Sequence, residues 1–371
     1  MKILFVAPRF HTNQSTIVKT LINKGHRVYF HVSTIGPTED YSNITPEIIE
    51  ESILSIIRTK IFGDGGKNKK GYFPKIIKYY SVIKKISPDI LIIRRHGRVF
   101  SYMATFYGRL CKAKIVFYDQ IHSSYYLKNH SQINNYFKKI KLLFILKFFN
   151  AKWFTPLHNL NNNSNLPNRC YYLPFAVDIK VNDEIKINNP VRLLTVGKYY
   201  KRKNHNLLIN ALSQLNGDND FHLTIVGEVS NENHDIFFSE IKDLVKSKQM
   251  NNKIDFITNV PFNKMKSIYK SNDLFILPAT DEPASISILE AMGYGLPVIC
   301  SDSCGTKNYI KNNYNGSIFE SGNVDSLQKH ISKYVNNFDL LIQQKKWISE
   351  NINGLLSGEN YYHYFKKMIN I

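Results

Sequence analysis

Two glutamates separated by seven residues, Glu282 and Glu290, have the spacing that most directly suggests chemistry in this 371-residue sequence. They stand in the segment DLFILPATDEPASISILEAMGYGLPVIC, which predicts a strand ending at Leu277 or Pro278, a loop, and a helix over about 284–294. At the rise of a helix the two backbones would be about 10 to 12 Å apart. That is the span from a sugar ring to a ribose across a diphosphate, so each carboxylate could accept hydrogen bonds from hydroxyl groups at one end.

The start of the expected helix supplies chemistry for an anion between the two carboxylates. The first N–H groups of a helix have no partner within it and carry a partial positive charge, which suits a diphosphate. The loop also follows a predicted strand, and ligands of open parallel sheets gather at the carboxyl ends of strands. Carboxylates and helix amides together predict a site for a nucleotide diphosphate sugar.

The elements that position these residues follow a regular rhythm along the chain. Apolar, β-branched runs alternate with amphipathic stretches, which indicates parallel sheets with crossover helices. These runs are KILFVAP, HRVYFHV, DILIIRR, AKIVFY, VRLLTVG, FHLTIVG, KIDFIT, DLFILPA and LPVIC. The chain is too long for one ordinary core, so we expect two α/β domains.

The polar segment VNDEIKINNP, residues 181–190, interrupts this rhythm and is the expected interdomain linker. The predicted domains are residues 1–180 and 191–354, and a final helix over about 355–371 is expected to pack back on the first domain. No segment approaches the roughly 20 apolar residues that span a bilayer. The start MKILFVAPRF reads as a buried strand and not as an export signal, so we expect a soluble, cytoplasmic protein.

The C-terminal half resembles glycosyltransferase family 4. The resemblance rests on the two glutamates with the following Ala-Met and Gly-x-Pro-Val-Ile, and on VGKYYKRKNHNLLINAL, which is similar to the family's strand and loop with two basic residues for the donor phosphates. It implies the GT-B fold, which has two Rossmann-like, doubly wound parallel-sheet domains facing across a cleft. It also implies a retaining, hexosyltransferase-type enzyme.

The resemblance assigns roles to residues one by one. Glu282 would hold hydroxyls of the transferred sugar, Glu290 would hold the ribose, and Lys198 and Lys203 would hold the phosphates. Lys198 stands where the family usually has arginine, so bidentate phosphate contact is lost while the charge remains. The expected donor-binding residues are Gly197, Lys198, Lys203, Glu282, Ser285, Ile286, Ser287 and Glu290, where Ser285, Ile286 and Ser287 would act through backbone amides.

The acceptor side of the resemblance is carried by fewer residues. His122, in AKIVFYDQIH, matches a family histidine that faces the reaction centre. The expected catalytic residues are therefore Glu282, Lys203, Lys198 and His122. A histidine with a structural hydrogen bond fits the position of His122 equally well, and both interpretations stay open. The polar stretch HTNQST replaces the glycine-rich acceptor loop that the family carries after its first strand.

The expected reaction moves a sugar from a nucleotide diphosphate sugar, with UDP favoured over GDP, to a hydroxyl of a lipid-linked precursor of a cell-surface glycan such as lipopolysaccharide or capsule. Two alternatives remain. A sugar-nucleotide epimerase or hydrolase of the same fold would use the donor pocket without an acceptor. A nucleic-acid-binding or regulatory protein would use the net charge of +20, but no recognised nucleic-acid motif accompanies that charge.

The same positive charge suggests a membrane surface as a partner. The segment 134–152, NNYFKKIKLLFILKFFNAK, interleaves lysines with large apolar residues. It could lie in an anionic membrane interface at the inner face of the plasma membrane, or pack on a core with its lysines outward. No metal or cofactor is expected. Asp218, Asn219 and Asp220 resemble a manganese-binding triplet, but LNGDND is a stretch of turn formers between a helix and a strand.

Overall fold

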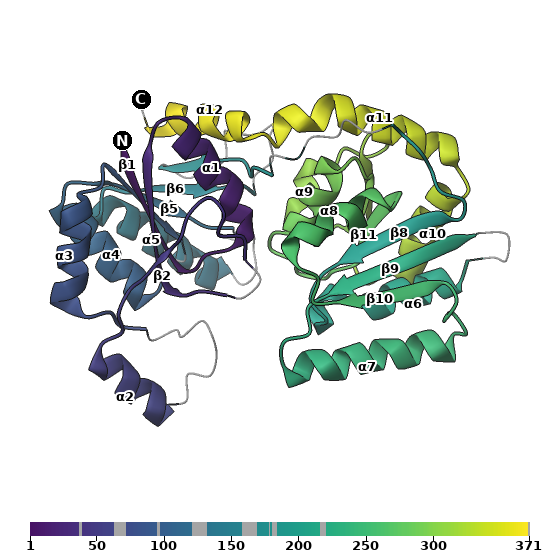
Figure 1. Ribbon diagram of the computed structural model, residues 1–371, viewed down its shortest axis with the longest axis horizontal. Coiled ribbons are helices and arrows are strands. Elements are labelled where there is room, and N and C mark those ends of the chain that lie inside the picture. Colours follow the sequence, from purple (N-terminus) through teal and green to yellow (C-terminus); the bar gives the residue numbers. More distant parts are fainter. Residues whose placement is uncertain are drawn as a thin grey trace. The chain divides into compact units, whose positions relative to one another are not determined.

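The computed structural model divides the chain into two α/β units (Figure 1). Unit 1 comprises Met1–Ala176 and Gly358–Ile371, and unit 2 comprises Val177–Ser357. The structure describes residues 1–36, 39–62, 72–94, 97–120, 132–157, 169–177, 179, 184–215 and 220–369, apart from the side chains of Thr12, Thr59, Phe62 and residues 132–139.

The segment 181–190, expected as a linker, is grouped with unit 2. In its described part, Asn188 donates to Asp273 Oδ2 from its backbone nitrogen at 3.2 Å and from Nδ2 at 3.0 Å. Asp273 is fully buried beside Lys345, whose Nζ lies 3.0 Å from Oδ1. These polar contacts fasten the end of the segment to the body of unit 2.

Unit 1 contains a seven-stranded sheet in the order β3-β2-β1-β4-β5-β6-β7, and its described strand pairs are all parallel. Its strands are β1 (Lys2–Arg9), β2 (Arg27–Thr34), β3 (Glu47–Ile48), β4 (Ile90–Arg94), β5 (Lys114–Tyr118), β6 (Lys152–Thr155) and β7 (Cys170–Tyr172). Its α-helices are α1 (Ser15–Asn23), α2 (Ile53–Phe62), α3 (Ile76–Ile86), α4 (Val99–Leu110), α5 (Gln132–Phe148) and α12 (Gly358–Ile369), with a 3-10 turn at Thr12–Gln14.

Both faces of the unit 1 sheet are covered. Along β1, Leu4 and Val6 pack with residues of α3, α4 and α5. Ile3 and Phe5 point to the other face and pack with residues of α1 and α12. Because alternate side chains of a strand point to opposite faces, a strand with a helix layer on each side must be apolar throughout. That is the reason KILFVAP reads as an unbroken apolar run.

The C-terminal helix α12 belongs to unit 1. Its Tyr361 and Phe365 are buried in the same core as β1. The last carbonyls of a helix have no partner within it. Here Lys114 Nζ donates to the carbonyl oxygen of Ile369 at 3.2 Å, and Lys152 Nζ donates to that of Met368. Two lysines from the sheet thus satisfy the end of the helix and oppose its partial negative charge.

Unit 2 contains a six-stranded sheet in the order β10-β9-β8-β11-β12-β13, and its described strand pairs are also all parallel. Its strands are β8 (Val191–Val196), β9 (Phe221–Gly227), β10 (Ile254–Thr258), β11 (Leu274–Leu277), β12 (Val298–Ser301) and β13 (Gly316–Phe319). Its α-helices are α6 (His205–Ser213), α7 (Glu232–Ser247), α8 (Phe262–Lys270), α9 (Ile286–Gly293), α10 (Val324–Val335) and α11 (Phe338–Leu355), with 3-10 turns at Lys201–Lys203 and Gly305–Tyr309.

The sheet of unit 2 reverses its strand order beside β8. The chain winds outward through β9 and β10 on one side, and through β11, β12 and β13 on the other. The reversal lies between the two central strands, β8 and β11, and parallel sheets bind ligands at the carboxyl ends of the strands beside such a reversal. The prediction of two parallel-sheet α/β domains is confirmed. In the described part of the chain, none of the helices is both long and apolar enough to cross a bilayer.

Candidate active site

Glu282 is held in a tight turn between β11 and α9. The preceding residue, Asp281, has a left-handed backbone with φ +49°, and its nitrogen donates to Ser303 Oγ at 3.2 Å. The carbonyl oxygen of Glu282 accepts from the nitrogen of Gly305 at 2.8 Å. Contacts from the loop after β12 thus fix the backbone on both sides of Glu282. Its side chain is only 7% exposed.

Two cations from the loop after β8 meet the Glu282 carboxylate. Lys203 Nζ donates to Glu282 Oε2 at 2.8 Å, and Arg202 Nη1 lies 2.9 Å from the same oxygen. The Arg202 contact is an ion pair without hydrogen-bond geometry, because Nη1 is not aligned with an acceptor. Thr280 N also donates to the carbonyl oxygen of Arg202 at 2.9 Å, which ties the two loops together. The structure therefore brings Lys203 and Glu282 into direct contact.

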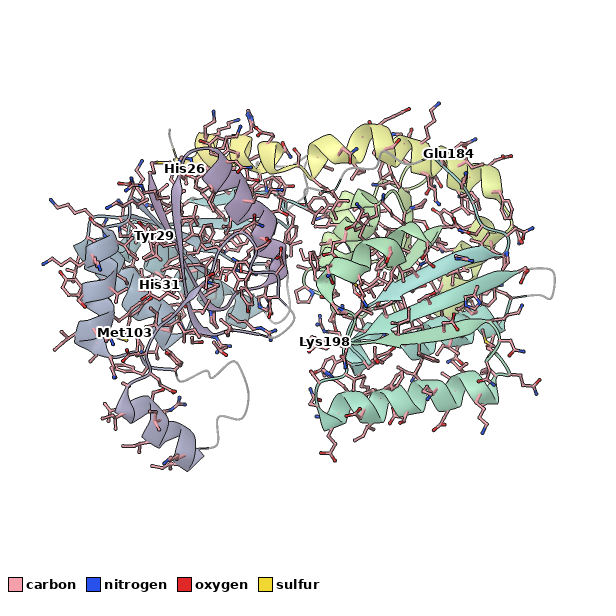
Figure 2. The ribbon with its side chains drawn as sticks, in the orientation of Figure 1. His26, Tyr29, His31, Met103, Glu184 and Lys198 are labelled. Atoms are coloured by element: carbon pink, nitrogen blue, oxygen red, sulfur yellow. The ribbon has the colours of Figure 1, made fainter. Side chains whose placement is uncertain are left out.

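Gly197 and Lys198 follow β8 directly. A Cβ at Gly197 would lie 3.0 Å from both Cδ and Cε of Lys203, so the absent side chain lets the lysine stem pass along the backbone. Figure 2 shows Lys198 at the end of the unit 2 sheet. Its Nζ pairs with Glu228 Oε2 at 2.8 Å, and its side chain is 51% exposed. Lys198 is thus a more solvated cation than Lys203, whose side chain is 13% exposed.

Helix α9 begins at Ile286, two residues later than the sequence predicts, because Ser285 keeps an extended backbone with φ −96° and ψ 114°. Ser285 N donates to Thr306 Oγ1 at 3.4 Å, and Ser287 Oγ donates to the carbonyl oxygen of Val196 at 3.3 Å. The N–H groups of Ile286 and Ser287 belong to the first turn, where a helix offers its amides no internal partner. No acidic residue stands in that turn, so its partial positive charge remains available to an anion.

A pocket of about 480 Å³ joins these features. It is lined by Gly197, Lys198, Lys203, Glu282, Ser285, Ile286 and Ser287 from the predicted set, and by Val196, Tyr200, Arg202, His234 and Ala284. Arg202 and His234 are pocket residues that sequence reasoning missed. His234 lies in the first turn of α7 just after β9, where its Nδ1 accepts from the nitrogen of Ser230 at 3.3 Å.

Glu290 lies on α9 but does not line this pocket. Its Oε2 accepts a hydrogen bond of 2.9 Å from the hydroxyl of Tyr269 on α8. Burial raises the pKa of Glu290, while the Tyr269 hydrogen bond acts in the opposite direction. The Tyr269 ring stacks on Tyr294 with centroids 5.1 Å apart, which fixes the direction of its hydroxyl. Tyr269 therefore orients the second glutamate of the motif.

The other residues singled out in the sequence add no contact to the site. His122, Asp218 and Asn219 lie outside the described residues, and Asp220 is exposed. Within the described ranges, His, Cys, Asp and Glu side chains form no group of three that could hold a metal ion.

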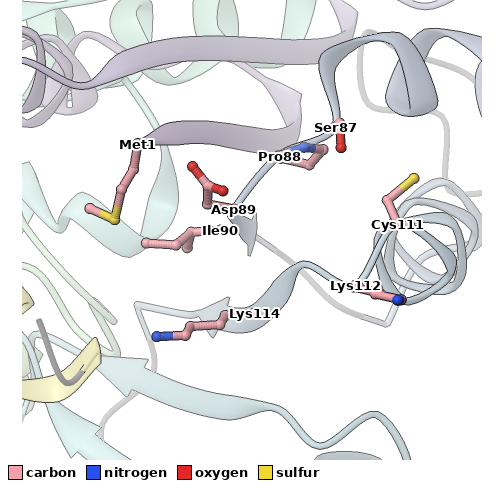
Figure 3. A pocket seen from close by; sticks show the side chains of 8 residues that line it. All are labelled: Met1, Ser87, Pro88, Asp89, Ile90, Cys111, Lys112 and Lys114. Carbon is pink, nitrogen blue, oxygen red and sulfur yellow. The ribbon is translucent and has the colours of Figure 1, made fainter.

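A second pocket of about 480 Å³ lies in unit 1, at the amino ends of β4 and β5 (Figure 3). It is lined by Met1, Ser87, Pro88, Asp89, Ile90, Cys111, Lys112 and Lys114. The carboxylate of Asp89 is already engaged there, because its Oδ2 accepts from the nitrogen of Lys2 at 2.7 Å. Parallel sheets bind ligands at the other ends of their strands, so the pocket beside Glu282 is the candidate active site.

Solved structures show the same fold along the whole chain. A glycosyltransferase from Rickettsia africae superposes with a TM-score of 0.72 and 18% identity over 99% of this chain and 98% of that one. Anabaena HepE in complex with UDP gives a TM-score of 0.74 and 12% identity over 100% of both chains. The architecture is the GT-B fold of glycosyltransferases.

The sequence model of the family described as "Glycosyl transferases group 1" matches residues 178–365, just over half of the chain. The chain belongs to this family. It is 27% identical over 180 residues to an uncharacterized glycosyltransferase of Haemophilus influenzae, covering 44% of this chain and 49% of the relative. It is 32% identical over 92 residues to the UDP-Gal:alpha-D-GlcNAc-diphosphoundecaprenol alpha-1,3-galactosyltransferase of Escherichia coli, covering 25% of this chain and 24% of that relative. The chain thus spans less than half the length of either relative.

Proposed function

We propose that the chain is a retaining glycosyltransferase that transfers a hexosyl group from a UDP-sugar to a hydroxyl of a lipid-linked precursor of a cell-surface glycan. The observation that carries the proposal is the Lys203–Glu282 contact beside the N-terminus of α9. The pocket that contains this contact is also lined by Ile286 and Ser287, the first residues of that helix. The carboxylate can accept hydrogen bonds from the hydroxyls of a sugar. The ammonium group and the helix amides can hold a diphosphate.

The proposed chemistry is electrostatic. Breaking the anomeric bond places negative charge on the leaving diphosphate, and preformed positive groups at that point lower the barrier. Lys203, Lys198 and the amides of Ile286 and Ser287 supply these groups. Glu282 accepts hydrogen bonds from hydroxyls of the transferred sugar through Oε1, since no hydrogen bond to that oxygen is found among the described residues. Glu290, held by Tyr269, receives the ribose hydroxyls.

UDP is proposed over GDP because the Escherichia coli relative is named for UDP-Gal and HepE is a complex with UDP. The lipid-linked acceptor is proposed on similar grounds. That relative is named for a diphosphoundecaprenol acceptor, and the lipopolysaccharide outer core galactosyltransferase WaaB shares the fold with a TM-score of 0.67. The reaction would then take place at the cytoplasmic face of the plasma membrane. His122 is proposed to face the acceptor hydroxyl.

Retention and independence of metal are parts of the same proposal. Lysines and helix amides neutralise the leaving diphosphate, so activity is expected to survive a chelator. Transfer to the same face of the sugar is expected through assistance by the leaving phosphate, and the anomeric configuration is read directly from the product by NMR.

The test is a panel of UDP- and GDP-sugars offered to the purified protein with an undecaprenyl-diphosphate sugar as acceptor. The expected result is a new glycoside from one UDP-sugar, in the presence of EDTA, with the anomeric configuration of the donor. Consumption of donor without any glycoside would instead assign the pocket to an epimerase or hydrolase. Absence of binding and turnover with every donor would overturn the proposal.

A further inference from the structure

We propose that α2 and the first turn of α3 form a surface that inserts into the headgroup region of an anionic lipid bilayer. This surface, called the isoleucine surface below, consists of Ile53, Leu54, Ile56, Ile57, Ile61, Ile76 and Ile77. The inference goes beyond the proposed reaction, because it assigns a partner to a region that no step of glycosyl transfer uses. It also replaces the segment 134–152 as the main point of membrane contact.

The aliphatic side chains of α2 are exposed to an unusual degree. A surface helix of a globular protein turns its apolar side chains toward the core. In α2 the opposite holds: Ser55 is buried, whereas Ile53 and Leu54 are each 71% exposed. At the start of α3, Ile77 is 84% exposed. Single exposed aliphatic residues are ordinary, but a cluster of seven is typical of a surface that binds something.

Polar contacts at its base hold α2 in place. Ser55 Oγ donates to Glu51 Oε1 at 2.6 Å and accepts from the nitrogen of Phe73 at 3.1 Å. Ser52 N donates to the carbonyl oxygen of Phe73 at 2.8 Å, so the segments that lead into α2 and α3 run side by side. Figure 1 shows α2 beyond the end of α3, away from the sheet of unit 1. These hydrogen bonds thus hold α2 through Ser55 and the residues before it, while its apolar side chains remain exposed.

The charge around the isoleucine surface selects an anionic partner. Within residues 53–62 and 72–80, which hold this surface, all ionised side chains are basic: Arg58, Lys60, Lys75 and Lys78. Two acidic residues just before α2 offset part of this charge: Glu50 pairs with Lys75 at 2.8 Å and also with Lys78, and Glu51 accepts the hydrogen bond from Ser55. A second copy of the chain would bring the same positive charge against it, which opposes association. An anionic bilayer offers hydrocarbon to the isoleucines and phosphate to the basic residues.

Helix α5 presents a smaller apolar surface. Its Leu142 and Leu146 are buried in the core of unit 1. Ile140, Phe144 and Phe148 are exposed, and the two phenylalanine rings stack with their centroids 6.1 Å apart. The described side chains of α5 therefore divide between covering the sheet and facing solvent. The isoleucine surface has more exposed apolar side chains than α5.

The experiment is sedimentation of the purified full chain with vesicles of phosphatidylcholine, with and without 30% phosphatidylglycerol. The variant Leu54→Ser/Ile57→Ser/Ile61→Ser removes the centre of the surface. Its matched control, Ile236→Ser/Ile257→Ser/Ile342→Ser, removes three exposed isoleucines of unit 2. The wild type and the control are expected to bind anionic vesicles alike. The α2 variant is expected to bind at least tenfold more weakly, since burial of one aliphatic side chain is worth on the order of tenfold in partition.

Equal vesicle binding by wild type and α2 variant, or no binding by the wild type, would overturn the inference. Light scattering without vesicles gives the other decisive outcome: a dimer that dissociates in the α2 variant would assign the surface to a second copy. The melting temperature of each variant, expected to equal that of the wild type, shows that the fold is intact. Vesicle binding needs no donor or turnover, so its result stands whether or not the proposed reaction is correct.

Discussion

Lys203 Nζ lies 2.8 Å from Glu282 Oε2, and the two side chains come from loops after different strands of the unit 2 sheet, 79 residues apart in sequence. The contact joins the group proposed to hold the sugar to a group proposed to hold the phosphate. A donor with its sugar at Glu282 therefore places its diphosphate within reach of Lys203. Each of the two charges compensates the other at a nearly buried position.

The unequal burial of the two lysines predicts unequal effects on turnover. Lys203→Met should lower kcat/KM on the order of 100-fold or more, because a charge at a nearly buried site is weakly screened. Lys198→Met should lower it on the order of tenfold. Added salt should slow the wild type and Lys203→Met through the exposed Lys198, and should affect Lys198→Met less. Steady-state kinetics from 50 to 500 mM salt measure this. Equal losses in both variants would contradict the assignment.

Gly197→Ala should act on Lys203 without removing any charge. The new Cβ would lie 3.0 Å from Cδ and Cε of Lys203, so the lysine stem must shift away from its present path. We expect a loss of kcat/KM of about tenfold, since small displacements of positioned groups are expensive in catalysis. The control is Gly354→Ala in α11, where a Cβ would meet nothing within 4 Å. Kinetics of the two variants, each relative to the wild type, measure the difference.

Tyr269→Phe should move the pH dependence of donor binding. The hydroxyl of Tyr269 lowers the pKa of Glu290, which burial otherwise raises. Without that hydrogen bond the pKa rises further, so Glu290 is protonated at a higher pH and accepts ribose hydroxyls less well. The rise in KM toward acid pH should begin at a higher pH in the variant, with kcat nearly unchanged.

The matched control for this prediction is Tyr294→Phe. It keeps the ring that stacks on Tyr269 and leaves the Tyr269 hydrogen bond to Glu290 in place. Its KM profile should follow that of the wild type. An unshifted profile in Tyr269→Phe, or an equal shift in both variants, would show that the Tyr269 hydrogen bond does not govern Glu290.

His205 should make the stability of the protein depend on pH. Burial and the nearby Lys203 lower the pKa of this histidine to about 3. In the unfolded chain this histidine binds a proton near pH 6.5, whereas in the folded chain it stays neutral at that pH. The free energy of unfolding is therefore highest above pH 6.5 and falls as the pH is lowered below that value. From pH 7 to pH 5 the free energy of unfolding should fall by about 2 kcal/mol more in the wild type than in His205→Phe. That variant keeps an aromatic ring beside Tyr199. Urea unfolding at the two pH values measures this, and equal losses would refute it.

Much of the framework follows from local sequence. Runs such as VRLLTVG and FHLTIVG form β8 and β9 because buried parallel strands are apolar on both faces. Short strands such as β13, Gly316–Phe319, carry too few residues for a pattern to stand out. The helix after Glu282 starts late because Ser285 is held extended beside Thr306, a contact across 21 residues that no local pattern contains.

The site divides in the same way. Glu282 could be found because it follows a readable strand end and is spaced seven residues from Glu290, whereas Lys203 was singled out by the resemblance to the family's pair of basic residues. Arg202 was missed because KYYKRK offers several equivalent cations, and only the fold of the turn decides which of them face the pocket. His234 was missed although it lies in the first turn of the helix after β9, a position that parallel sheets use for ligands. His122 lies outside the described residues, and its role stays a prediction.

The most direct test of the central claim is the rate of sugar transfer by Glu282→Gln, with the donor that the wild type uses and with Glu320→Gln, an exposed glutamate of the same unit, as control. Glutamine keeps the size of the side chain but removes the charge that faces Lys203 and the sugar. The account predicts a rate on the order of 100-fold or more below the wild type, and a control within twofold of it. Transfer by Glu282→Gln at the wild-type rate, with an unchanged melting temperature, would contradict it.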